Sequence, residues 1–249
     1  MPAQDTDNPP APRRLVIVPA YNEADSIGEV VRTLRAAVPD YDVLVVDDGS
    51  TDGTARAVPA GARVVRLPFN QGIGGAMQTG YRFAEMHGYD VAVQVDGDGQ
   101  HPADQVPRLV ETLEREGVDV VVGSRFLDAR SYRPPASRML GIHMLRALLR
   151  VLAGQRVTDC TSGFRAAGRR AICAFAYWYP EDYPEPEVIL LLRRGGYTVR
   201  EVAVEMNPRT TGTTSIPLHA GVFYVLKVSV ALLLDLFRGP WPKERVRPS

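Results

Sequence analysis

The chain has no net charge and very little cysteine, and each absence excludes a class of protein. Its 29 basic and 29 acidic side chains give a formal net charge of zero, so nothing indicates a surface that binds nucleic acid. Cys160 and Cys173 are the only cysteines and form no CxxC pair, which excludes a disulfide framework. We therefore expect a reducing, cytoplasmic compartment.

The N-terminal segment lacks the apolar stretch of a signal peptide, and the chain has no internal repeat. Residues 1–13 are polar and rich in proline, which predicts a disordered tail. The 249 residues, of which 45% are hydrophobic and 23% charged, are enough for one sizeable globular domain with a real core.

Short apolar segments alternate with amphipathic helical segments over the first half of the chain. The expected strands are residues 15–19, 43–46, 62–67, 91–95 and 118–122. This alternation predicts an α/β fold, in which a mostly parallel sheet is covered by helices on both faces. The second half is less regular. There the expected elements are helices at 137–152, 188–192 and 218–238 and a strand at 198–206.

Polar side chains follow three of the expected strands. These clusters are Tyr21-Asn22-Glu23, Asp47-Asp48 and the stretch from Asp96 to Gln100. The carboxyl ends of parallel strands meet at one edge of the sheet, so we expect the clusters to converge. A site for a nucleotide and its phosphates is the natural inference.

The turn that follows Val95 carries the strongest chemical signal. Asp96 and Asp98 flank Gly97, whose missing side chain lets a ligand come close. Carboxylate oxygens grouped in this way suit Mg²⁺ or Mn²⁺ shared with substrate phosphates. An EF-hand loop also starts with this spacing, but the glycine and glutamate that it requires further along are missing.

Seven short motifs together resemble those of family 2 glycosyltransferases with the GT-A fold, a Rossmann-like architecture. The nearest branch is that of the dolichyl-phosphate mannose synthases and polyprenyl-phosphate sugar transferases. The motifs occur in family order within residues 14–216, and seven in register are far more specific than any one. They are VIVPAYNE (16–23), VVDDGSTDGT (45–54), NQGIGGAMQTG (70–80), VDGDGQHP (95–102), GSRF (123–126), SGFRA (162–166) and PRTTGTTS (208–215).

The resemblance implies roles for individual side chains in binding a nucleotide-diphosphate sugar. Tyr21 is implied to pack on the nucleobase, and Asp48 to accept hydrogen bonds from it. Gly72 is expected to form a tight turn near the donor, because the glycines around it lack the dinucleotide-binding spacing. The other residues implied at this end are Pro19, Glu23 and Asp47.

A second set of implied contacts concerns the metal and the phosphates. Asp96, Asp98 and Gln100 resemble the metal and diphosphate ligands, with Asp96, Gly97 and Asp98 also counted among the donor contacts. Arg125, Arg209 and Ser215 resemble the family's phosphate-binding residues. The chain departs from the branch at Ile216, where lysine is common, so one phosphate contact is absent or supplied elsewhere. The resemblance also implies inversion at the anomeric carbon.

The chemistry of the acceptor decides whether a general base is needed. A hydroxyl acceptor must lose a proton to a nearby carboxylate, whereas a lipid phosphate is already ionised. The candidate bases are Asp159, Glu185 and Glu187, and the candidate catalytic set is Asp98, Arg125, Asp159 and Glu187. We favour a polyprenyl phosphate, because helix 137–152 is basic and amphipathic and the last helix is apolar.

Residues 217–249 form an expected C-terminal unit of an apolar helix and a basic tail. Lys227 and Asp235 interrupt the helix, which favours packing on the domain or lying in a membrane interface over spanning the bilayer. A peripheral position at the cytoplasmic face of a membrane follows, and a small membrane-protein partner is compatible with it.

Three alternatives remain open on sequence grounds. The first is a glycosyltransferase that acts on a hydroxyl acceptor. The second is a sugar-phosphate nucleotidyltransferase, which would need a glycine-rich phosphate loop after the first strand, where this chain has Pro19 to Glu23. The third is an inactive subunit that binds nucleotide sugars. The nucleotide of the donor, whether UDP, GDP or dTDP, stays undetermined.

Overall fold

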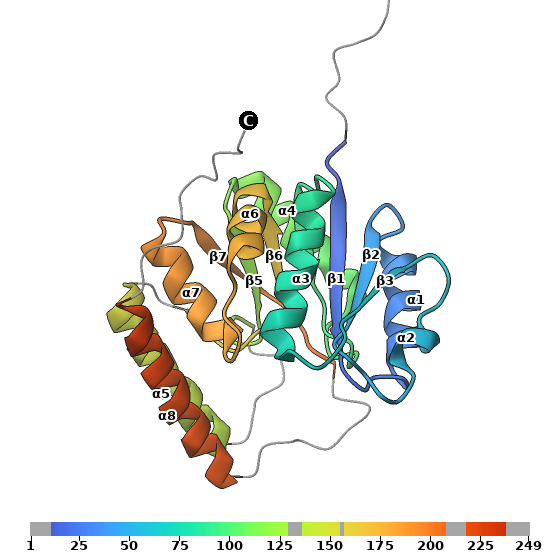
Figure 1. The fold of residues 1–249 in the computed structure, drawn as a ribbon. Helices are drawn as coiled ribbons and strands as arrows, with labels where there is room; N and C mark the ends of the chain where they lie inside the picture. Colours follow the sequence, from blue (N-terminus) through green and yellow to red (C-terminus); the bar gives the residue numbers. More distant parts are fainter. Residues whose placement is uncertain (1–10, 129–135, 155–156, 208–217, 238–249) are drawn as a thin grey trace, which may run out of the picture.

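A single seven-stranded sheet organises the protein (Figure 1). The computed structural model describes residues 11–128, 136–154, 157–207 and 218–237. The strand order is β3-β2-β1-β4-β6-β5-β7. The strands are β1 (Arg14–Ala20), β2 (Asp42–Asp47), β3 (Arg63–Arg66), β4 (Val91–Gln94), β5 (Val120–Ser124), β6 (Arg165–Gly168) and β7 (Val199–Ala203).

All neighbouring strands pair in parallel except β6, which runs antiparallel between β4 and β5. The predicted α/β class with a mostly parallel sheet is thus confirmed. The register places Ala20 beside Asp47, so the chain leaves β1 and β2 at the same edge. The turn that follows β4 leaves at this edge too, since the backbone N–H of Val95 donates to the carbonyl of Ile17.

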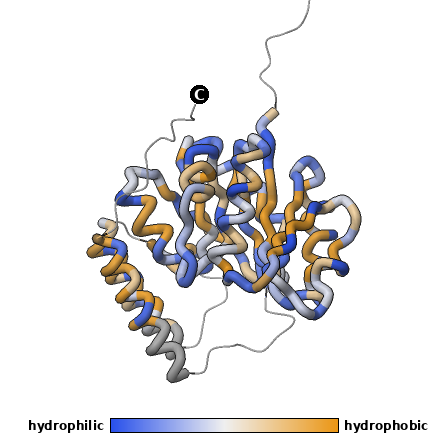
Figure 2. The backbone as a smooth tube through the Cα atoms, viewed as in Figure 1, coloured by the Kyte–Doolittle hydropathy of each residue, from blue (hydrophilic) through white to orange (hydrophobic). Residues whose placement is uncertain are grey.

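Helices cover both faces of the sheet, and each face has its own apolar core. One core lies under α3 (Gly72–Met86), α6 (Arg169–Tyr177) and α7 (Pro184–Arg194). The other lies under α1 (Ile27–Ala37) and α4 (Val106–Glu116). The short helices α2 (Thr54–Ala57) and η1 (Ala103–Gln105) complete this layer. Figure 2 shows apolar residues in the strands and along the helices.

Several expected boundaries were wrong. The sequence analysis predicted neither β6 nor α6. Strand β6 was missed because its sequence, Arg165-Ala166-Ala167-Gly168, has none of the β-branched residues that mark the other strands. Helix α7 begins at Pro184, not at Val188, and β7 is shorter than the expected 198–206. Proline is well tolerated in the first turn of a helix, which explains the earlier start of α7.

Helices α5 (Ala136–Ala153) and α8 (Leu218–Asp235) lie side by side and project from the sheet domain (Figure 1). We call this pair the helical arm. A third apolar cluster joins its two helices to α7, with Leu145, Val228 and Ile189 among its members. In the described part of the chain, no helix combines the length and apolar character that crossing a membrane requires.

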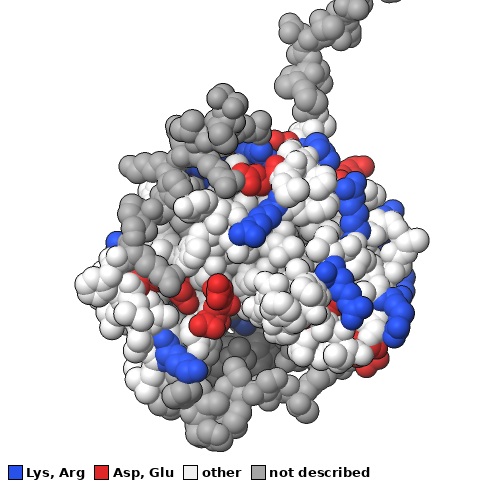
Figure 3. All heavy atoms as spheres, in the orientation of Figure 1, with Lys and Arg blue, Asp and Glu red and all other residues white. Residues whose placement is uncertain are grey.

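Charged side chains are scattered over the face shown in Figure 3, with both signs interspersed. No single-sign surface gathers among the described residues of that face.

The predicted N-terminal tail lies almost wholly outside the described residues, and so do the phosphate-site candidates Arg209 and Ser215.

Candidate active site

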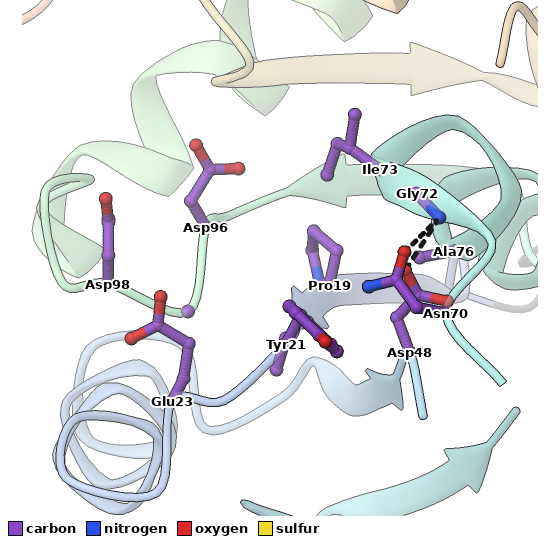
Figure 4. Close-up of a pocket in the computed structure, with 12 residues that line it drawn as sticks. Pro19, Tyr21, Glu23, Asp48, Asn70, Gly72, Ile73, Ala76, Asp96 and Asp98 are labelled. Atoms are coloured by element: carbon purple, nitrogen blue, oxygen red, sulfur yellow. Dashed lines mark hydrogen bonds between the residues drawn. The ribbon is translucent and has the colours of Figure 1, made fainter. Parts of the chain in front are cut away.

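A cleft of about 280 Å³ opens where β1, β2 and β4 end (Figure 4). It is lined by eight of the residues implied to bind the donor or the metal. The carboxylates Asp96 and Asp98 lie at one end, Asp48 and Gly72 lie at the other, and Tyr21 and Pro19 lie between them. The eight are Pro19, Tyr21, Glu23, Asp48, Gly72, Asp96, Gly97 and Asp98.

Asp48 is held by the start of α3. Its carboxylate accepts the backbone N–H of Gln71 at 2.7 Å and that of Gly72 at 2.9 Å. Gly72 has a φ of +81°, in the left-handed region that glycine tolerates, so the tight turn expected there is present. A carboxylate has about four lone-pair sites, which leaves Asp48 able to accept further hydrogen bonds from a ligand in the cleft.

Asp47 has a different environment from its neighbour. It is buried, it does not belong to the lining of the cleft, and its Oδ1 accepts the backbone N–H of Ser50 at 2.9 Å. Its Oδ2 lies 3.3 Å from Nε of Arg66. These contacts give Asp47 a role in shaping the loop after β2, and only Asp48 faces the cleft.

The loops after β1 and β2 are tied together by Asn22. This residue has a φ of 55°, the only positive value among the described residues other than glycine. Its N–H donates to Oγ of Ser50, and its side-chain oxygen accepts the N–H of Thr51. Asn is one of the few residues that tolerate this conformation, so Asn22 holds the loop that presents the half-exposed Tyr21 to the cleft.

Glu23 links the loop after β1 to the turn from Asp96 to Gln100, which we call the metal turn because the sequence predicts a metal site there. Oγ of Ser26 lies 2.8 Å from the Glu23 carboxylate and 2.7 Å from the carbonyl of Gly97, so its one proton is shared or alternates between them. A Cβ atom at Gly97 would lie 3.1 Å from the carbonyl of Pro19, so a glycine lets the two segments approach closely.

Asp96 and Asp98 are oriented by neighbours in the sequence. Oδ1 of Asp96 accepts a hydrogen bond from Gln94 at 3.1 Å, and Asp98 accepts the backbone N–H of Gln100 at 3.0 Å. His101 accepts the backbone N–H of Asp96, and its ring stacks on Phe164 with the ring centroids 4.9 Å apart. The sequence analysis did not identify Gln94 or His101 as support for the metal turn. Their only signal was proximity in the chain.

The carboxylates suit a divalent cation that the substrate helps to hold. The described residues contain no group of three or more His, Cys, Asp or Glu side chains arranged to bind a metal ion. Asp96 and Asp98 both face the cleft and supply hard oxygen ligands, as Mg²⁺ and Mn²⁺ prefer. Two carboxylates are a usual protein contribution to Mg²⁺ sites that substrate phosphates complete. Gln100 does not line the cleft itself.

Arg125 and Asp159 form a buried, bidentate ion pair. Nε and Nη2 of Arg125 donate to the carboxylate at 2.7 and 2.8 Å, and its backbone N–H donates at 3.1 Å. The pKa of Arg125 is raised: burial acts to lower it, and the hydrogen bonds and charge of Asp159 outweigh that effect. These contacts point to a role for Asp159 in holding Arg125.

The two remaining candidate bases lie in the first turn of α7. Glu187 is buried in the helix, whereas Glu185 keeps part of its surface accessible. Burial raises the pKa of Glu185, and the nearby charge of Arg165 acts to lower it. The charge of Asp96 also acts on Glu185, which places Glu185 within electrostatic reach of the cleft.

Comparison with known proteins identifies the family. The model of glycosyl transferase family 2 matches residues 15–175, which include β1 from its second residue, β2 to β6 and the whole lining of the cleft. The chain belongs to this family. It is therefore a glycosyltransferase, and the resemblance inferred from the seven motifs is confirmed.

Two relatives illustrate the branch of this family 2 glycosyltransferase. An undecaprenyl-phosphate mannosyltransferase of Micrococcus luteus is 38% identical over 168 residues, which cover 62% of this chain and 65%, just under two thirds, of the relative. A polyprenol monophosphomannose synthase of Mycolicibacterium smegmatis is 29% identical, and the match covers 92% of each chain.

The solved structures support the same fold. Glucosyl-3-phosphoglycerate synthase from Mycobacterium tuberculosis, crystallised with Mg²⁺ and uridine diphosphate, has a TM-score of 0.68 and 26% identity. The match covers 90% of this chain and 79% of that one. The arrangement of strands and helices is thus that of known nucleotide-sugar enzymes.

Proposed function

We propose that this glycosyltransferase moves a sugar from a nucleotide-diphosphate sugar to a polyprenyl phosphate at a membrane surface. The observation that carries the proposal is the helical arm, which exposes apolar side chains on both of its helices. Met144 and Val151 on α5 and Leu226, Val230 and Leu234 on α8 are all more than 45% exposed. Exposed apolar helix faces of this kind can bury themselves in the interface of a bilayer.

The cleft would hold the donor along its length. Tyr21 would pack against the nucleobase and Asp48 would accept its N–H groups, while Asp96 and Asp98 would lie at the diphosphate. These two carboxylates would hold Mg²⁺ or Mn²⁺, which neutralises charge on the leaving nucleoside diphosphate. Arg125 would donate to phosphate oxygens, with Arg209 and Ser215 proposed in the same role.

The transfer itself needs no base when the acceptor is a phosphate. A phosphate oxygen forms a bond to the anomeric carbon, and the bond from that carbon to the donor diphosphate breaks. The electron pair of the broken bond leaves with the nucleoside diphosphate, and no proton moves. Attack from the side opposite the leaving group inverts the anomeric centre. The chain's own task is then to position both phosphates and exclude water.

A hydroxyl acceptor is the second candidate, and Glu185 is the observation that favours it. A carboxyl group whose pKa is raised by burial, within reach of the charge of Asp96, has the properties of a general base. In that case the acceptor proton would pass to the Glu185 carboxylate as the glycosidic bond forms.

A comparison of acceptors tests the proposal. Purified protein would be screened first with UDP-, GDP- and dTDP-sugars for thermal stabilisation in the presence of Mg²⁺ or Mn²⁺. The best donor would then be supplied with a polyprenyl phosphate, the matching polyprenol, or a soluble sugar. We expect turnover with the polyprenyl phosphate and with neither the polyprenol nor the soluble sugar. Turnover with a hydroxyl acceptor that is lost in Glu185→Gln would establish the second candidate instead.

A further inference from the structure

We propose that Arg146 on α5 binds the phosphate group of the acceptor. Together with Phe126 and Arg125 it forms a cluster, which would be the binding site of that phosphate. This inference rests on the proposed function. Nε and Nη2 of Arg146 are buried, and neither has a hydrogen-bond partner among the described residues. Buried guanidinium N–H groups are costly to leave without an acceptor, so donors of this kind are suited to an anionic ligand.

Phe126 fixes the position of the Arg146 side chain. The guanidinium carbon of Arg146 lies 4.2 Å from the centroid of the Phe126 ring. A cation held over an aromatic face is stabilised by the ring, but the ring does not accept the N–H groups that point outward in the guanidinium plane. The stacking therefore orients Arg146 and leaves the hydrogen-bonding capacity of its Nε and Nη2 unused among the described residues.

Arg125 contacts the same ring, with its guanidinium carbon 5.7 Å from the centroid. Its charge is balanced by Asp159, and its Nη2 also donates to Thr161 at 2.7 Å. No carboxylate within the described parts of the chain forms an ion pair with Arg146. The net positive charge of this cluster among the described residues is therefore that of Arg146.

The cluster is linked to the cleft through Arg125 and to the helical arm through Arg146. The charge of Asp96 acts on Arg125, which ties the cluster to the metal end of the cleft. Both Arg146 and Arg125 act on the buried thiol of Cys160, which places them in one neighbourhood. Arg146 itself belongs to α5, one of the two helices of the arm. A phosphate on an apolar chain held by the arm would meet Arg146 beside the sugar of the donor.

The change in charge during the transfer explains why Arg146 would be useful in addition to Arg125. A phosphate monoester carries between one and two negative charges near neutral pH, because its second pKa is about 6. After the sugar has been added, the phosphate is a diester with one charge. A cation beyond the neutralised Arg125–Asp159 pair therefore favours binding of the acceptor over binding of the product. The ligand class is a phosphate monoester, whether carried on an isoprenyl chain or free.

Calorimetry with a short, water-soluble isoprenyl phosphate tests this assignment. Arg146→Gln is expected to raise its Kd at least about tenfold, the size expected for losing a charge-assisted hydrogen bond. The matched control is Arg150→Gln, one turn further along the same helix, where the side chain is exposed. It should change Kd less than about twofold, because exposed charges contribute little. Donor affinity should be unchanged in both variants.

Several outcomes would overturn the inference. A Kd within twofold of the wild-type value in Arg146→Gln, with or without a lower Tm, would show that Arg146 only stacks on Phe126. If that variant does not fold, Arg146→Lys decides, since it keeps the charge and loses the planar fork; an unchanged Kd there overturns the assignment. Binding of inorganic phosphate without binding of isoprenyl phosphate would assign the site to a free anion and refute an acceptor role.

The same titration separates this inference from the function on which it rests. Wild-type protein that neither binds nor glycosylates an isoprenyl phosphate would refute the proposed function. Wild-type protein that does both, with Arg146→Gln unchanged, would refute the role of Arg146 alone.

Discussion

His101 contacts both the backbone and the carboxylate of Asp96. Its Nδ1 accepts the backbone N–H of Asp96 at 3.0 Å, and its Nε2 lies 3.6 Å from the carboxylate of the same residue. An imidazole that accepts through Nδ1 and is neutral carries its proton on Nε2, so the ring directs that N–H toward the carboxylate. The ring itself is fixed by stacking on Phe164. His101 thus sets the direction in which Asp96 enters the cleft.

We expect His101→Ala to weaken divalent-metal binding about tenfold, the usual size of an outer-shell effect, because Asp96 loses its orientation. His101→Asn should be milder, since its side-chain oxygen can still accept the Asp96 N–H. The measurement is the Kd of Mn²⁺ in the presence of nucleoside diphosphate, by calorimetry. The exposed His87 provides the control variant, His87→Ala. Equal affinity in all four proteins would remove His101 from this role.

Gly72 is expected to matter for both stability and donor binding. A Cβ atom at this position would meet only the carbonyl of Glu181, at 3.9 Å, so Gly72→Ala is limited by its φ of +81° and not by a clash. The left-handed conformation should cost about 1–2 kcal/mol of unfolding free energy. Displacement of the N–H that Asp48 accepts should also weaken nucleotide binding.

Gly117→Ala is the matched control for Gly72→Ala. It introduces the same strain at a φ of +60°, in open space at the end of α4. Chemical denaturation should show a similar loss of stability in both variants, whereas nucleotide affinity should fall in Gly72→Ala alone. A parallel fall in Gly117→Ala would contradict a specific role for the turn at Gly72.

Glu185 should make stability depend on pH in a defined direction. Burial raises its pKa in the folded protein above the ordinary value of 4.5, so the folded state binds the proton more tightly than the unfolded state. The group's contribution to stability is therefore present below about pH 4.5 and is lost as the pH rises through the folded-state pKa. The free energy of unfolding, measured from pH 4 to 8, should fall more steeply with rising pH in wild-type protein than in Glu185→Gln. Parallel curves would refute it.

Cys160 should resist alkylation in the folded protein. Burial, followed by the charge of Asp159, raises the pKa of its thiol to about 12. At pH 8 the reactive thiolate is then only about one part in ten thousand, far below that of an ordinary cysteine. In a Cys173→Ser background, iodoacetamide should modify the chain at least about 100-fold faster after unfolding. Rapid labelling of the native variant would show that the site around Asp159 opens.

The helical arm should bind phospholipid vesicles. Replacing Leu226, Val230 and Leu234 together by glutamine removes three exposed apolar side chains from α8. The loss should lower vesicle partitioning about 100-fold in a sedimentation assay, because each side chain contributes on the order of 1 kcal/mol on partial burial. Met86→Gln, at an exposed apolar position on α3, should partition like the wild-type protein. If the triple variant still sediments with vesicles, the arm is not the membrane contact.

The lining of the cleft could be predicted from sequence because its residues sit in short, local motifs. The motifs follow strands whose β-branched composition is distinctive, and parallel strands bring their carboxyl ends to one edge. Tyr21, Asp48, Asp96 and Asp98 therefore line one cleft, as expected. The sequence could not predict that Asp48 faces the cleft and Asp47 does not. The direction of each carboxylate depends on its contacts with Ser50, Arg66 and the start of α3.

The surroundings of Arg125 and Arg146 were decided by contacts between distant residues. Arg125 and Asp159 are 34 residues apart, and their pairing depends on the strands and turns that bring them together. Arg146 reaches Phe126 only because α5 packs against α7 and α8. The sequence by itself determined the family, the strand–helix alternation and the motifs that line the cleft, because these are encoded in local spacing and composition. Tertiary structure alone decided which charges are paired and which face the cleft, because burial and charge pairing arise between segments that only folding brings together.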